Sequence, residues 1–182
     1  MDASRKPSAI LVAALLASIV PAASAAVFNE GADFSNLGAA PTLLGDFAPG
    51  SHSVSGQLGS SDNNDFFSFN VDGLLEAVTL SGWSGAGNTF IGLYAQDFAP
   101  PGGQIGEGFF NSGNLGASPF NSVDPFSGGA LAGGDYTVAL TNLQGVGYTL
   151  EFTVGAAPIP LPAAWLAFLP AAGVLLGRRA RR

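Results

Sequence analysis

The chain has 182 residues and a formal net charge of −7, but its charges are strongly segregated along the sequence. All six basic residues lie near the two ends, so residues 26–177 hold 12 acidic residues and no lysine or arginine. Nucleic-acid binding and phosphoryl transfer need cationic side chains against phosphates, and the absence of cysteine removes disulfides and thiolate chemistry. The composition therefore excludes these classes and predicts no nucleic-acid partner.

The first 25 residues have the layout of a secretory signal peptide. Two basic residues precede an uncharged apolar run over 9–20, which is too short to span a bilayer. Small residues follow at 23–25, as signal peptidase requires. We therefore expect an N-terminal signal helix (residues 1–25) that is cut between Ala25 and Ala26. An uncleaved anchor helix is the alternative.

Residues 26–157 are expected to fold as one domain, which holds 24 of the 26 glycines and 13 of the 14 phenylalanines. Apolar and polar residues alternate along several short segments, as in strands with one buried and one solvent-facing side. These segments are 51–58, 67–71, 78–81, 88–95, 136–141 and 148–154. The pattern predicts an all-β domain, an antiparallel β-sandwich or jelly roll.

Residues 98–127 interrupt this pattern with four prolines and six glycines. We expect a long irregular loop region there, with one strand near 103–110. Among the strand residues, Glu151 is expected to face solvent and His52 to lie on the surface. Trp83 either packs on the core, which we favour, or stacks on a sugar ring.

The order of the strand motifs resembles the bacterial pre-peptidase C-terminal domain, a small β-sandwich carried by secreted proteins. The resemblance rests on the segments 54–58, 62–69, 90–94, 131–138 and 147–150. It implies the same sandwich fold for the middle of the chain. The long 98–127 region departs from the family pattern.

One polar cluster offers candidate metal ligands. Asp62 and Asp65 lie three residues apart with two asparagines between them, and Ca²⁺ prefers such hard oxygen ligands. Some members of the resembled family bind Ca²⁺ with acids at this place and others upstream, where this chain has Glu30 and Asp33. The other interpretation is a polar turn, because Asp and Asn readily bond their own backbone. The cofactor is thus either none or Ca²⁺.

A second apolar segment closes the chain, within residues 158–182. The uncharged stretch 156–177 has 22 residues, enough for a helix of about 33 Å that spans a bilayer. A basic cluster follows it and should keep the C-terminus cytoplasmic. The cluster consists of Arg178, Arg179, Arg181 and Arg182. We expect a C-terminal transmembrane helix.

The residues before this span carry a proline-rich motif, formed by Ile159, Pro160, Leu161, Pro162, Ala163 and, two residues on, Trp165. Motif, span and basic end together resemble a PEP-CTERM-type sorting signal, nearest its Val-Pro-Leu-Pro-Ala variant. The resemblance implies an exosortase substrate of a Gram-negative bacterium that is processed near the motif. A permanent single-span anchor is the alternative.

These features predict an exported, non-enzymatic protein that is structural or adhesive at the cell surface or in an exopolysaccharide matrix. Its expected partners are signal peptidase, exosortase, the inner membrane transiently, and extracellular polysaccharide. A calcium-dependent carbohydrate-binding module and a secreted hydrolase are the alternatives. The sequence has no Gly-x-Ser-x-Gly motif and a single histidine, so no catalytic residue is predicted.

Overall fold

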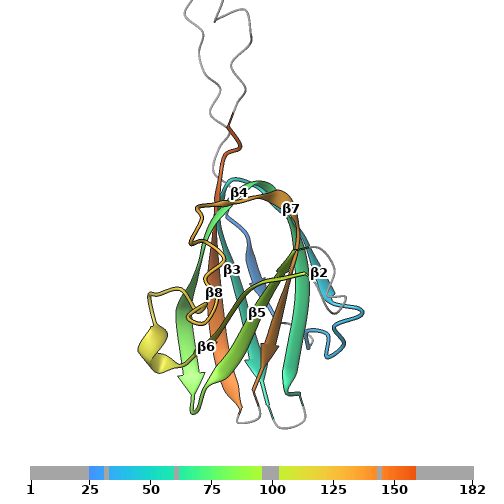
Figure 1. Cartoon of the computed structure of the whole chain (residues 1–182). Helices are drawn as coiled ribbons and strands as arrows, with labels where there is room; N and C mark the ends of the chain where they lie inside the picture. The colour runs from blue at the N-terminus through green and yellow to red at the C-terminus, as the bar shows by residue number, and fades with distance from the viewer. Residues whose placement is uncertain (1–24, 31–32, 60–61, 96–102, 143–144, 159–182) are drawn as a thin grey trace, which may run out of the picture.

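The computed structural model describes residues 25–30, 33–59, 62–95, 103–142 and 145–158 (Figure 1). Strands are the dominant regular structure of these residues, which contain no α-helix, and this confirms the predicted all-β class. The elements are β1 (Val27–Asn29), β2 (Thr42–Phe47), β3 (Gly50–Leu58), β4 (Asn64–Gly85), β5 (Thr89–Ala95), β6 (Gln104–Phe110), a 3-10 turn η1 (Ser112–Asn114), β7 (Leu131–Thr141) and β8 (Val146–Gly155).

The two predicted terminal helices fall mainly on residues 1–24 and 159–182, outside the described part of the chain. Among the residues that are described, no helix has the length and apolar character needed to cross a membrane.

The strands form one sheet in the order β1-β3-β8-β4-β7-β5-β6, with β2 paired to β4. Most pairs are antiparallel, but β1 runs parallel to β3 and β2 runs parallel to β4. The predicted antiparallel arrangement therefore holds for most strand pairs, but the sheet as a whole is mixed. Parallel partners need a long connection, and here each connection contains an intervening strand.

Strand β4 is 22 residues long and carries the chain from one layer to the other. Its first half pairs with β7 and its second half with β8. Between the halves, Gly73 has a φ of 149°, and a Cβ there would collide with the carbonyl oxygen of Gly155. Glycine alone suits this position. The sheet folds over at this bend (Figure 1), which gives a β-sandwich-like arrangement and joins the two strands predicted at 67–71 and 78–81.

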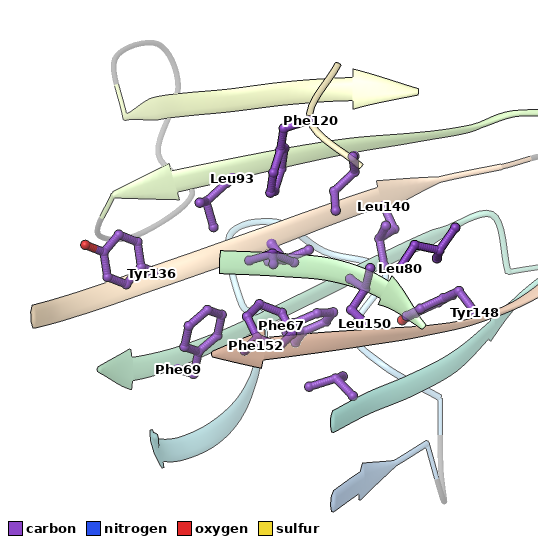
Figure 2. Close-up of a cluster of buried hydrophobic side chains, with 14 of the residues drawn as sticks. Phe67, Phe69, Leu80, Leu93, Phe120, Tyr136, Leu140, Tyr148, Leu150 and Phe152 are labelled. Carbon is purple, nitrogen blue, oxygen red and sulfur yellow. The ribbon is translucent and has the colours of Figure 1, made fainter. Parts of the chain in front are cut away.

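The core lies between the two layers and is rich in aromatic rings. Phe67 and Phe69 from the first half of β4 pack against Phe152 of β8, with ring centroids 6.3 and 4.9 Å apart. Figure 2 shows these three rings side by side, nearer to Tyr136 than to Tyr148, which lies at the opposite end of the cluster. The contacts between β4 and β8 hold the layers together.

Burial along β3, β5 and β8 follows the predicted alternation, whereas residues 136–140 of β7 are buried on both faces. Ile91 and Leu93 of β5 are fully buried, whereas Phe90 and Tyr94 on the other face are half-buried. Glu151 is exposed, as predicted. The period of two therefore located the inner face of β3, β5 and β8 correctly.

The described part of the predicted irregular region, 103–127, contains β6 where a strand was expected. After η1, the chain returns along the outer edge of β6. Glu107 and Val123 exchange backbone hydrogen bonds, and Phe120 is buried in the core. This segment therefore covers an edge of the sheet.

His52 is buried, contrary to the prediction of a surface side chain, with 1% of its area exposed. Its ring stacks on Phe47 with centroids 4.5 Å apart, and Nε2 lies 2.6 Å from the carbonyl oxygen of Ala48. The reason is that His52 is in phase with the buried Val54 on β3, so its ring faces inward, where Phe47 of β2 covers it. Trp83 is half-buried and packs edge-to-face on Phe110 at 5.3 Å, in line with the favoured core interpretation.

Candidate metal centre

Four acidic side chains meet beside the start of β4. Glu30 directly follows β1, Asp33 lies three residues later, Asp62 precedes β4, and Asp65 is the second residue of that strand. One carboxylate oxygen from each lies within 4.8 Å of the other three. The fold thus brings the predicted pair together with the two upstream acids.

Strand β1 positions Glu30 in this group. The parallel pairing of β1 with β3 ends where the Glu30 amide donates to the carbonyl oxygen of Ser55 at 2.9 Å. The Glu30 carboxylate accepts from the backbone amides of Gln57, on β3, and Phe34, the latter at 2.9 Å. Glu30 is therefore held by backbone donors from two segments.

Asp65 is the buried member of the group, with 0% of its area exposed. It points inward because it is in phase with Phe67 and Phe69 on β4. Its Oδ2 accepts from the Tyr148 hydroxyl at 2.7 Å, whereas its Oδ1 has no hydrogen-bond partner. The Oδ1 of Asp62 is likewise buried without a partner. Unsatisfied buried carboxylate oxygens are costly, so this arrangement favours a bound cation or proton.

Burial and mutual repulsion change the acidity of both aspartates. Burial, then a hydrogen bond and the charge of Asp33, raise the pKa of Asp62 to about 6. For Asp65, burial raises the pKa to about 7, with contributions from Glu30 and Asp62, although the Tyr148 hydroxyl acts in the opposite direction. Burial, and then the Asp65 charge, raises the pKa of Tyr148 well above its ordinary value. The centre thus resists full ionisation in the absence of a cation.

The donor set fits Ca²⁺. Ca²⁺ takes oxygen ligands at about 2.3–2.6 Å, so oxygens on opposite sides of the ion stand up to about 5 Å apart. The four carboxylate oxygens lie within that span. Since residues 26–177 contain no lysine or arginine, no such side chain of this domain can neutralise them.

Sequence reasoning missed the role of Tyr148. Its alternating strand predicted a core ring, but nothing in the sequence indicated a hydrogen bond to Asp65, which lies 83 positions away. The one local signal is Gly56, which pairs with Tyr148 across β3 and β8. A Cβ at position 56 would collide with the Tyr148 hydroxyl, so a glycine here leaves room for the tyrosine side chain.

The other predicted sites lie at the ends of the chain. Ala25 and Ala26 are described, and the Ala26 carbonyl oxygen accepts from the Ser53 amide at 2.9 Å. The first residue after the predicted cleavage site therefore already contacts the sheet. The sorting motif at 159–165 and the arginines at 178–182 lie outside the described residues.

No protein-family model matches this chain, and neither does any curated protein. Its function is therefore argued from its residues and their geometry.

Proposed function

We propose that the protein is an exported, non-enzymatic structural or adhesive component of the cell surface or extracellular matrix, and that Ca²⁺ stabilises its fold. The observation that carries the proposal is the Asp65 carboxylate, fully buried among three further acids with one oxygen unpartnered. A cation at this point supplies the missing partner for Asp65 and removes the repulsion between the four acids.

The ion would act as a structural cross-link. Glu30 and Asp33 belong to the segment after β1, whereas Asp62 and Asp65 belong to the start of β4. Through Asp65, the site also reaches Tyr148 on β8. Since β1 has only three residues, the metal would hold the N-terminal segment far more firmly than its own strand pairing does.

A structural role suits the geometry better than hydrolysis. The two carboxylates of a glycosidase flank the scissile bond and stand about 5–9.5 Å apart. The four acids of this centre have oxygens within 4.8 Å of one another, and one of the acids is completely buried. The surface or matrix destination is supported by the signal-like N-terminus and the sorting-like tail.

Calcium binding is tested by calorimetric melting of the protein after treatment with a chelator. For a dissociation constant of about 0.1–1 mM, typical of extracellular calcium sites, about 10 mM Ca²⁺ should stabilise the native state by about 1.4–2.7 kcal/mol. An unchanged melting temperature in millimolar Ca²⁺ would remove the metal from the proposal.

The destination is tested separately by the intact mass of the protein isolated from its native cells. We expect a mature chain that starts at Ala26 and ends near the motif at 159–163. A mass that includes residues beyond about 170 would show that the tail remains as an anchor.

A further inference from the structure

Phe109 on β6 is the single aromatic residue among the six large apolar side chains that are exposed in the described residues, with 51% of its area accessible. Phe90 lies directly across from it on β5, and the two rings pack edge-to-face at 5.5 Å. Their chain neighbours Ile91 and Phe110 are fully buried. Alternation therefore places the Phe90–Phe109 pair on the outer face of the sheet.

The backbone of Phe109 is held firmly at the sheet edge. The side chain of Asn121 accepts from the Phe109 amide at 2.9 Å and donates to the Phe109 carbonyl oxygen at 2.7 Å. These two bonds occupy the groups through which another strand would pair at this residue. The exposed ring is thus preorganised for a side-chain contact.

Polar groups surround the ring pair, and the acidic one among them is Glu107, two residues before Phe109 on the same face of β6. Phe90 pairs with Phe109 on one side and with Thr141 of β7 on the other. Thr141 in turn pairs with Asn64 of β4, so the four residues form one row across the outer face of the sheet. The Thr141 hydroxyl donates to the Asn64 side-chain oxygen at 2.8 Å. Beyond the strand ends, the Asn111 and Asn88 side chains bond each other at 2.7 Å. Amides and hydroxyls beside an exposed aromatic face match the hydroxyl and C–H surfaces of a sugar ring.

We propose that Phe90 and Phe109 form a platform for a neutral polysaccharide, an inference that rests on the adhesive role proposed above. The C–H face of a pyranose packs on Phe109, while the flanking amides and hydroxyls bond its hydroxyl groups. An anionic polysaccharide is disfavoured because residues 26–177 carry 12 acids and no lysine or arginine. Trp83, the aromatic that the sequence suggested for stacking, instead packs on Phe110.

The test is native affinity electrophoresis of the purified protein in gels that contain a soluble neutral polysaccharide. Mixed-linkage β-glucan and galactomannan are the neutral probes, and alginate is the anionic comparison. We expect retardation in at least one neutral gel and none in alginate. Phe109→Ala should weaken the apparent affinity at least about tenfold, whereas Phe109→Trp should retain it.

Leu43→Ala is the matched control, because Leu43 is an exposed apolar residue on β2, with 76% of its area accessible. It should bind as the parent protein does, and Phe109→Ala should melt at the parent temperature. Equal retardation of parent and Phe109→Ala, retardation in alginate alone, or none in either neutral gel overturns the inference. So does self-association that depends on Phe109 in light scattering without glycan binding. These outcomes do not depend on export or on calcium, so they leave the proposed function standing.

Discussion

Two clusters attach β1 and the residues that follow it to the rest of the domain. They differ in the interaction that stabilises them. The aromatic cluster joins Phe28, Phe47, His52, Phe69 and Phe152 from five strands, with the other four rings 4.5–5.6 Å from Phe47. The acidic centre joins Glu30, Asp33, Asp62 and Asp65. The aromatic rings attract one another directly, whereas the carboxylates repel until protons or a cation neutralise them.

The difference shows that one short segment can be attached in two ways. The aromatic attachment rests mainly on the packing of rings and needs no cation. The acidic attachment should depend on solution composition, because protons and the proposed Ca²⁺ would neutralise its carboxylates. Substitutions in the aromatic cluster should therefore lower stability equally with and without Ca²⁺. Substitutions in the acidic centre should change stability by an amount that depends on pH and Ca²⁺.

The largest loss of folding stability is expected from Phe47→Ala, which removes the central ring of the aromatic cluster. Emptying a fully buried phenylalanine site costs about 3–5 kcal/mol, or about 10–20 °C in melting temperature for a domain of this size. Thermal unfolding should show the same loss with and without Ca²⁺. Leu43→Ala on the same strand, where the side chain is exposed, should change stability by less than about 0.5 kcal/mol.

Asp65→Asn is expected to abolish the stabilisation by Ca²⁺, about 1.4–2.7 kcal/mol in about 10 mM Ca²⁺. Without metal, the variant should melt at or above the parent temperature at neutral pH, because a buried like charge is removed. Asp72→Asn is the matched control, since Asp72 lies exposed on the same strand. A full calcium response in Asp65→Asn would show that Asp65 is not a ligand.

The acidic centre should also make stability depend on pH. In the folded protein the pKa of Asp62 is raised to about 6 and that of Asp65 to about 7, above the ordinary value of 3.8. The native state thus retains protons that the unfolded chain has lost, so this contribution to metal-free stability is greatest below about pH 4 and declines as pH rises through 6 and 7.

Calcium must displace those protons, so the rise in melting temperature that it causes should grow between about pH 5 and pH 8. Melting curves recorded across this range, with Ca²⁺ and with chelator, measure both trends. A calcium effect that stays constant over the range would contradict a site built on Asp62 and Asp65.

The smallest change in folding stability is expected from Tyr148→Phe, which removes the hydroxyl that donates a hydrogen bond to Asp65. One hydrogen bond contributes about 0.5–1.5 kcal/mol, and its loss should raise the Asp65 pKa further and weaken the calcium response at neutral pH. Tyr136→Phe is the comparison, because the Tyr136 hydroxyl donates to the carbonyl oxygen of Ala132 instead. Its calcium response should match that of the parent protein.

Alternation in the sequence located β3, β5, β8 and the second half of β7, whereas β6 was expected within a region that interrupts the pattern. It could not reveal β1, which is too short, or β2, in which Leu43 and Leu44 are adjacent and Gly45 has a positive φ of 90°. The burial of His52 was predictable, since it is in phase with the buried Val54 on β3 and alternation alone turns its side chain inward.

The candidate site was predictable only in its local part. Asp62 and Asp65 stand three residues apart, so the sequence shows them together. Their approach to Glu30 and Asp33 depends on the parallel pairing of β1 with β3, which no local pattern encodes. The family resemblance suggested those two acids, and the fold brings them into the same cluster.

The place of β8 in the sheet has a consequence for the order of folding. The last strand of the domain lies between β3 and β4, and its residue Val154 pairs with Gly50, about a hundred positions earlier. Until the chain is complete through Gly155, β3 lacks its principal partner. Such distant pairing makes folding slow and delays it until after synthesis of the whole domain. The sheet can therefore close only when β8, the final strand, has been added between β3 and β4.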